Sequence, residues 1–156
     1  MNAQEYFQHN PADSLSVINA CNALTAQYRS ILRELGQTNQ LSENAMLVLV
    51  HMASYPEANT QKKLQGTNLD LSLSSICRMV ESLRQKEYLS TQLDMNDRRS
   101  WILHLEERGK ALTDAFFLRL GQRLDEIMEK VPGFDTKTFV FMLSRVGMAA
   151  NLRDKS

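Results

Sequence analysis

The feature that most constrains the fold of this chain is a helix-like segment that leads, through a short strand, into a charged turn and a second strand. The segment starts at Leu71 as LSLSSICRMVESLRQKEYL, the turn is DMNDRRS, and the second strand, WILHL, ends at Leu105. We expect the first strand to span residues 88–93. The helix is predicted to be amphipathic because four apolar residues recur on one face, namely Ile76, Met79, Val80 and Leu83. Helix, strand, basic turn and strand form the layout of a winged helix, which makes DNA binding the leading hypothesis.

Helices are also predicted on both sides of this stretch, because apolar residues recur there at steps of three and four. From Val17 to Leu35 these steps form an apolar seam that includes Cys21, and Gly36 is expected to end this helix as a left-handed cap. Ser42, Thr60 and Ser72 are expected to cap the helices that follow them. The predicted helices outside the winged segment cover residues 15–35, 42–53, a short stretch after Thr60 that Gly66 or Asn68 closes, 107–131 and 135–152.

The charge of the chain argues against a protein that holds nucleic acid through a global positive field. The 156 residues carry 18 basic and 18 acidic side chains, and the formal net charge is zero. Residues 62–110 contain nine basic and seven acidic side chains, which is an excess of only two. Any binding to DNA must therefore depend on a few well-placed residues.

The sequence lacks the usual signs of export, membrane insertion and catalysis. The start, MNAQEYFQHNPADS, has no positive region followed by an apolar run, and no apolar run reaches the roughly 18 residues that a membrane span requires, so we expect a cytoplasmic protein with no membrane partner. Neither the two cysteines, Cys21 and Cys77, nor the three histidines have the spacing of a metal site or of a nucleophile with its base. We predict no enzymatic activity, no cofactor and no metal. Cys21, on the apolar seam, is predicted to be packed and inert.

Two segments resemble the MarR-type winged-helix transcriptional regulators of bacteria and archaea. The typical run of that family is close to LSxSTVSRLVDRLEERGLV, followed by D(P)xDRRxxxLxLTxxG. The present chain has LSLSSICRMVESL over residues 71–83 and DMNDRR over 94–99, leading to LHLEERG over 103–109. The resemblance implies a mainly α-helical fold: a winged helix-turn-helix with a two-stranded β-hairpin wing, and N- and C-terminal helices that form a dimerisation region. It divides the chain into an N-terminal dimerisation helix (1–40), a winged helix-turn-helix unit (41–106) and C-terminal dimerisation helices (107–156).

The N-terminal residues of a recognition helix are the ones that reach base edges in the major groove. This selects Ser72, Ser74, Ser75 and Arg78, where Arg78 is placed to contact a phosphate or a guanine edge. The alternative is that the serines only cap the helix and that Arg78 is solvated.

In the wing, the resemblance implies that Arg99 enters the minor groove, that Asp97 orients it and that Arg98 approaches a phosphate. The alternative is that Asp97 and Arg99 form an ordinary surface ion pair, which would contribute little to stability.

Four positions depart from the pattern of the family. Glu87 stands where glycine is usual at the end of the recognition helix, and Asp70 stands where a turn glycine is usual. Glu106 replaces the threonine that caps the following helix. Leu73 occupies a position that is often polar or basic, where it either contacts a thymine methyl group or represents the loss of a polar contact.

The resulting interpretation is a homodimeric, sequence-specific DNA-binding transcriptional regulator, a repressor, that binds a pseudo-palindromic duplex. Its half-sites are expected about one helical turn, roughly 10 base pairs, apart. The resemblance also implies a small-molecule effector, bound between the dimer region and the winged unit, that relieves repression. Two alternatives remain: a winged-helix module for protein interaction, which the zero net charge favours, and a redox-regulated repressor that uses Cys21.

Overall fold

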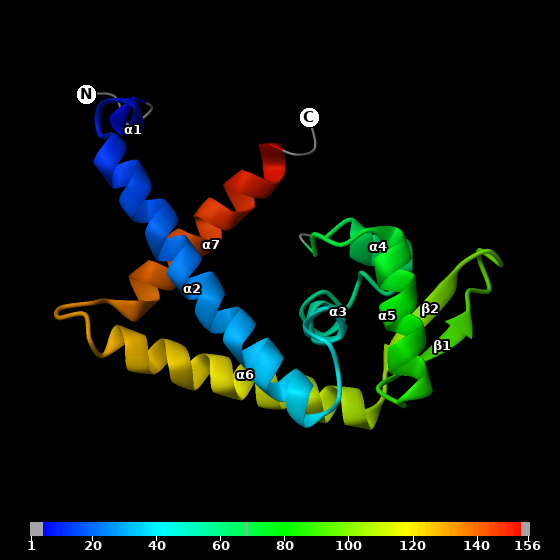
Figure 1. Ribbon diagram of the computed structural model, residues 1–156. Coiled ribbons are helices and arrows are strands. Elements are labelled where there is room, and N and C mark those ends of the chain that lie inside the picture. The colour runs from blue at the N-terminus through cyan, green and yellow to red at the C-terminus, as the bar shows by residue number, and fades with distance from the viewer. Residues whose placement is uncertain (1–4, 68, 154–156) are drawn as a thin grey trace. The chain divides into compact units, whose positions relative to one another are not determined.

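The computed structural model of the protein describes residues 5–67 and 69–153, which form helices and one antiparallel pair of strands (Figure 1). The elements are, in order, α1 (Tyr6–His9), α2 (Pro11–Thr38), α3 (Glu43–Ser54), α4 (Gln61–Gln65), α5 (Leu73–Gln85), β1 (Leu89–Leu93), β2 (Trp101–Leu105), α6 (Glu107–Met128) and α7 (Thr136–Arg153). The chain divides into two compact units, residues 1–120 and 121–156, and the boundary lies within α6. The mainly helical winged fold predicted from the sequence is confirmed.

The helix starts that were predicted from capping side chains are correct. Ser42, Thr60 and Ser72 each adopt an extended backbone, and each side-chain oxygen accepts a hydrogen bond from the backbone N–H three residues ahead, at 3.2 Å in every case. A cap of this kind stabilises a helix by about 1 kcal/mol. The three caps fix the start of α3, α4 and α5. Gly66 follows α4 as its C-cap, and Asn68 lies outside the described residues.

The predicted end of α2 is wrong. Gly36 lies inside the helix, which continues to Thr38, and the left-handed residue is Gln40, with φ 55°. The Leu41 N–H donates to the Gly36 carbonyl oxygen at 2.8 Å, and the Gln40 N–H donates to the Gln37 carbonyl oxygen at 3.2 Å, which is the Schellman arrangement. A Cβ atom at position 36 would lie 2.8 Å from the Leu41 carbonyl oxygen. Glycine is therefore required there for close backbone approach and not for a left-handed conformation.

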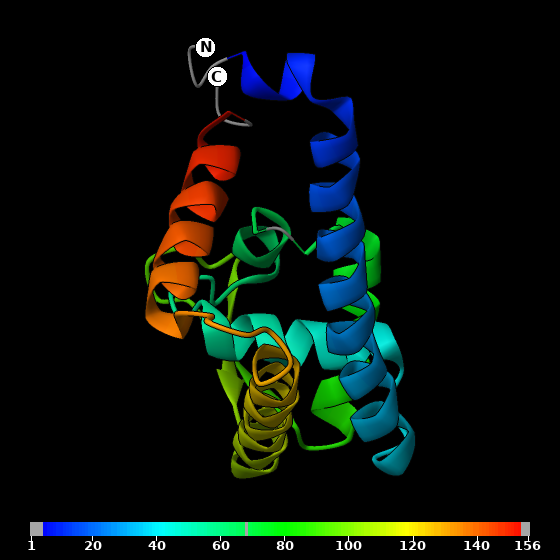
Figure 2. The same ribbon diagram turned by 90° about the vertical axis from the view of Figure 1, so that its left-hand side faces the viewer.

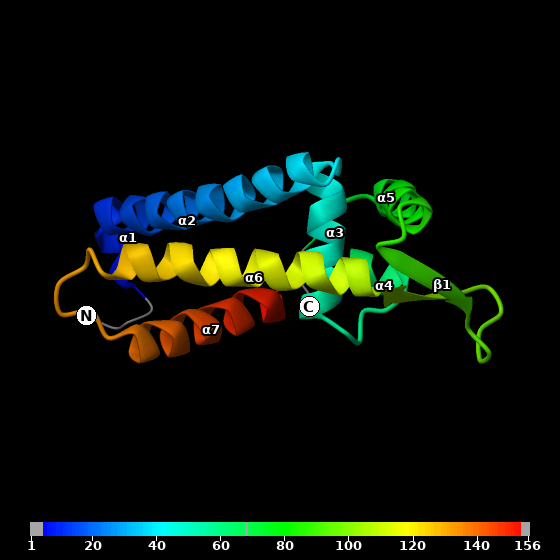
Figure 3. The ribbon, with the colours of Figure 1, turned by 90° about the horizontal axis from the view of Figure 1, so that it is seen from below.

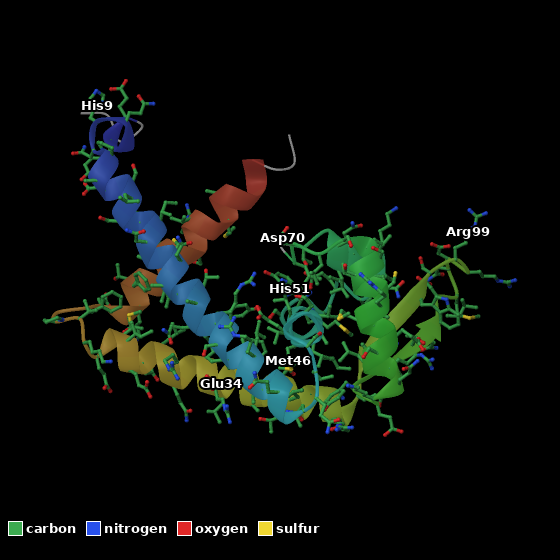
Figure 4. The ribbon with its side chains drawn as sticks, in the orientation of Figure 1. His9, Glu34, Met46, His51, Asp70 and Arg99 are labelled. Carbon is green, nitrogen blue, oxygen red and sulfur yellow. The ribbon has the colours of Figure 1, made fainter. Side chains whose placement is uncertain are left out.

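The end of α5 repeats this arrangement with Glu87 as the left-handed residue, at φ 60°. The Tyr88 N–H donates to the Leu83 carbonyl oxygen at 3.0 Å, and the Glu87 N–H donates to the Arg84 carbonyl oxygen at 3.1 Å. Tyr88 and Leu83, the apolar pair that accompanies this motif, are both fully buried. Asp70, in the turn before α5, also has a positive φ of 50° (Figure 4). Both positions where the sequence lacks an expected glycine thus adopt the conformation that glycine favours.

The core of the first unit lies around α3, which packs against both α2 and α5. Figure 2 shows α2 as one continuous helix with its C-terminal end against α3. The first half of α6 adds Phe116, whose ring meets the edge of Tyr28 at a centroid distance of 5.4 Å. The largest fully buried side chains include Ile31, Leu32, Met46, Leu49, Leu64, Ile76, Leu83, Tyr88 and Phe116. This core covers one face of α5 and leaves the opposite face exposed.

The hairpin is the predicted pair of antiparallel strands. In its register Leu89 lies opposite Leu105, Thr91 opposite Leu103 and Leu93 opposite Trp101. Leu103 is buried, and its N–H donates to the Asn59 carbonyl oxygen at 2.8 Å. This bond ties the base of the wing to the segment before α4.

The N-terminal half of α2 is exposed, contrary to the prediction that Cys21 is packed. The seam is buried from Ile31 to Leu35, but Val17 is exposed. The prediction was wrong because apolar periodicity identifies a face without identifying what covers it. None of the helices in the described ranges is both long and apolar enough to cross a lipid bilayer.

In the second unit, an aspartate cap begins α7. The Asp135 carboxylate accepts hydrogen bonds from the Thr138 hydroxyl and from the Lys137 N–H, the latter at 3.1 Å, and these bonds, the first of them foremost, lower the pKa of Asp135. The Phe134 and Phe139 rings pack edge to face at 4.8 Å. Along α7 a run of large apolar side chains is exposed, namely Val140, Phe141, Met142, Leu143, Val146 and Met148.

Candidate nucleic-acid interface

The first turn of α5 carries a closed cluster of serine hydroxyl groups. The Ser72 Oγ accepts from the Ser75 N–H, lies 3.0 Å from the Ser74 Oγ and donates to the Ser75 Oγ at 2.9 Å. Each hydroxyl has one proton, so the proton of Ser72 is used within the cluster, while Ser75 keeps its own proton available. The structure thus brings together three of the predicted residues, and of these Ser72 caps the helix.

Arg78 lies one turn further along α5 and is exposed. One of its terminal nitrogens donates to the Ser75 Oγ at 3.5 Å, and it forms no ion pair with any residue in the described ranges. Arg84, on the same helix, differs: its guanidinium contacts both oxygens of Glu81, at 2.8 and 3.0 Å, and this contact lowers the pKa of Glu81. The charge of Arg78 is therefore available to a partner, whereas that of Arg84 is largely neutralised.

In the wing, the structure shows how Asp97 orders the turn. Its carboxylate accepts hydrogen bonds from the Arg99 backbone N–H at 3.1 Å and from the Ser100 hydroxyl at 2.9 Å. These bonds, the first of them foremost, hold the pKa of the Asp97 carboxyl below its usual value. The Asp94 carboxylate accepts the Asn96 N–H in the same way, at 2.8 Å. Asp97 thus acts on the backbone of Arg99.

Arg99 itself projects outward from the hairpin loop (Figure 4), and the loop extends beyond α5 (Figure 3). Arg98 and Arg99 are both exposed, and within the described part of the chain neither forms an ion pair with a carboxylate. The alternative of a surface ion pair between Asp97 and Arg99 is therefore not what the structure shows. Two free guanidinium groups stand at the tip of the wing.

Sequence reasoning missed a junction at the C-terminal end of α5, which we call the Tyr88 junction (Asn39, Lys86, Tyr88, Arg108 and Gly109). The buried Tyr88 hydroxyl donates to the Asn39 side-chain oxygen at 3.3 Å, and the Arg108 guanidinium lies 4.4 Å from the centre of the Tyr88 ring. Arg108 also donates to the Lys86 carbonyl oxygen at 3.1 Å. The junction joins the end of α2, the end of α5 and the start of α6. In the sequence, the only indication of this junction is Gly109, the glycine of the LHLEERG segment.

A pocket of ≈ 550 Å³ lies between the end of α3, the segment after it and β2 on one side and the start of α6 on the other. It is lined by Met52, Ala53, Tyr55, Pro56, Ala58, Asn59, Leu103, His104, Leu105, Lys110, Thr113 and Asp114. Its lining combines an apolar part, which includes Leu103, with charged groups from α6. Lys110 also pairs with Glu107 at 2.8 Å. Among the described residues no group of three or more histidine, cysteine or acidic side chains is placed to hold a metal ion.

Comparison with solved structures shows which fold this is. A MarR transcriptional regulator from Methanosarcina mazei Go1 superposes with a TM-score of 0.67 over 90% of this chain and 98% of its own, at 18% identity. The chain has the MarR-type fold. CouR from Rhodococcus jostii RHA1, solved with p-coumaroyl-CoA bound, superposes on it with a TM-score of 0.64 at 19% identity, over 83% of this chain and 87% of its own.

A third protein of the MarR-type fold is Bordetella bronchiseptica BpsR, whose DNA binding is regulated by 6-hydroxynicotinic acid. It gives a TM-score of 0.60 at 14% identity, over 85% of this chain and 98% of its own. No model of a protein family matches the sequence, and no curated protein matches it. In this fold α5 and the hairpin occupy the places that the sequence predicted for the helix and the wing of a winged helix.

Proposed function

We propose that the protein is a sequence-specific DNA-binding regulator of transcription in the cytoplasm. The observation that carries this proposal is the combination of a MarR-type fold with exposed arginines at the two elements that such a fold offers to a duplex. Arg78 lies on the recognition helix and Arg99 at the tip of the wing, and neither is held by a carboxylate in the described part of the chain. A net charge of zero makes these few cations decisive.

In this proposal α5 enters the major groove. The free proton of Ser75 and the guanidinium of Arg78 donate to phosphates or to guanine acceptors, and Ser72 and Ser74 hold the turn in shape. Arg99 enters the adjacent minor groove, where narrow A·T-rich stretches concentrate negative potential, and Arg98 contacts the flanking phosphate. Asp97 positions Arg99 through the backbone bond described above.

We further propose that the protein acts as a homodimer. Exposed apolar side chains on α2, such as Leu15 and Ile18, and the exposed run on α7 support this, because apolar surface of this extent is normally covered. A two-fold axis then requires a pseudo-palindromic operator with half-sites about one helical turn, roughly 10 base pairs, apart.

A repressor relieved by a small molecule is the form of regulation that we propose. The pocket between the winged part and α6 is the place for such an effector, because a ligand there touches both β2 and the start of α6. CouR and BpsR are each associated with a small molecule, p-coumaroyl-CoA and 6-hydroxynicotinic acid respectively. An effector in this pocket changes DNA binding only if it favours one arrangement of the winged units over another.

The test uses the full chain and a duplex selected from random DNA, with affinity measured by fluorescence anisotropy at several salt concentrations. We expect Arg78→Ala and Arg99→Ala each to weaken binding by about 5- to 150-fold, and Arg84→Ala, the matched control whose charge Glu81 neutralises, to change it far less. Affinity should fall steeply with salt. Sedimentation should show the same oligomeric state for all variants. A flat salt dependence, together with unchanged affinity in both test variants, would instead favour the protein-interaction module.

A further inference from the structure

Leu73 is an exposed apolar residue in the otherwise polar first turn of α5. It is the first residue of that helix and keeps 40% of its surface exposed. Its neighbour Leu71 packs against the core, and Ile76 is fully buried in it. Leu71 and Ile76 hold the two positions that a hydrophobic staple uses at a helix start. The start of α5 therefore needs no apolar side chain at position 73.

The polar side chains around Leu73 are engaged with one another. Ser72 caps the helix and bonds to both Ser74 and Ser75, so these hydroxyls point into a shared cluster. Leu73 carries none of these bonds and is not among the apolar residues packed against the core. What the tip of the recognition helix offers to a duplex at this position is a branched apolar group.

Major-groove chemistry identifies the matching base. Of the groups that the four base pairs expose there, only the C5-methyl group of thymine is apolar. We propose that Leu73 is a specificity-determining residue that recognises the methyl group of one thymine in each half-site. This assignment rests on the proposed function, since it requires α5 to lie in the major groove of a duplex. It extends that function by naming a base feature that the operator must contain.

The chemistry also sets the expected effect. Burying one methyl group against an apolar side chain changes affinity by about fourfold, and a symmetric site with two such contacts by about 15-fold. Replacing thymine by uracil in the DNA removes this methyl group and leaves every hydrogen-bonding group in place. The affinity lost on replacing this thymine by uracil should therefore depend on the presence of leucine at position 73.

The experiment starts from duplexes selected by the full-length wild-type chain from random DNA. Each thymine of a half-site is replaced in turn by uracil, and affinity is measured for the wild type, for Leu73→Ala and for Leu93→Ala. Leu93 is a matched control, because it is a leucine of similar exposure, 38%, placed on the hairpin. Circular dichroism melts check that Leu73→Ala remains folded, which its exposed position favours.

We expect one thymine per half-site at which uracil weakens the wild type by about fourfold. Leu73→Ala should bind the uracil and thymine duplexes equally, while Leu93→Ala should discriminate like the wild type. If the wild type binds selected DNA but tolerates uracil at every position, or if Leu73→Ala retains the full discrimination, the Leu73 assignment is overturned and the proposed function stands. If the wild type enriches no sequence, the proposed function fails, and the assignment fails with it.

Discussion

Replacing Glu87 with glycine should stabilise the protein, although the change removes a side chain. Glu87 has φ 60° at the end of α5, a conformation that costs a residue with a Cβ about 1–2 kcal/mol and costs glycine almost nothing. Its carboxylate is exposed and forms no ion pair within residues 5–67 and 69–153, so little is lost with it. Glycine also makes the unfolded chain more flexible, which offsets about 0.5–1 kcal/mol.

The net gain for Glu87→Gly is about 0.5–1 kcal/mol, which corresponds to a rise of about 1–4 °C in Tm for a chain of this size. Thermal unfolding followed by circular dichroism would measure it, at one fixed protein concentration, because the proposed dimer makes Tm depend on concentration. Glu87→Ala is the matched control, since it removes the carboxylate but keeps the Cβ. Equal stability of the glycine and alanine variants would refute the reasoning, because the gain would then owe nothing to the left-handed backbone.

Two further predictions concern the Tyr88 junction and the wing. Gly109→Ala should destabilise the protein by about 3 kcal/mol or more in urea unfolding, because the new Cβ would lie 2.2 Å from the Tyr88 carbonyl oxygen. Gly121→Ala, on the same helix, should instead be neutral or stabilising, because no described residue beyond the helix's own backbone comes within 4 Å of the new Cβ. The pKa of Asp97 is lowered in the folded wing, so its ionised carboxylate stabilises the folded state. This stabilisation should be complete above the usual aspartate pKa of about 4 and should be lost as pH falls through the lower folded pKa. The NMR shift of the Arg99 amide should follow that titration, and an Asp97→Asn variant that still titrates there would contradict the assignment.

Much of the architecture could be predicted because its signals are local. Ser42, Thr60 and Ser72 cap helices through bonds that span only three residues, and the hairpin follows from its apolar strands and charged turn. The left-handed conformation at Glu87 and Asp70 was also foreseeable, since both stand where glycine is usual. These features need no knowledge of the rest of the molecule.

The errors share a different cause: each depends on a partner that is distant in the sequence or outside the chain. A glycine such as Gly36 can serve either as a left-handed cap or as a place where another backbone segment comes close. Only the approach of the Leu41 carbonyl oxygen shows that the second applies. Cys21 lies on a real apolar seam, but the periodicity does not say that this half of the seam is exposed in a single chain. Asp97 was correctly placed beside Arg99, yet the pattern did not show that the carboxylate holds the backbone and not the guanidinium.

The Tyr88 junction has a mechanical consequence. It fastens the C-terminal end of α5 to the end of α2, through Asn39, and to the start of α6, through Arg108. With these attachments α5 cannot slide or turn by itself without breaking a partly buried hydrogen bond and the contact of Arg108 with the Tyr88 ring. α5 therefore moves together with the end of α2 and the start of α6. A change in the angle between the end of α2 and the start of α6 would displace α5 and the hairpin together, with the packing between them intact.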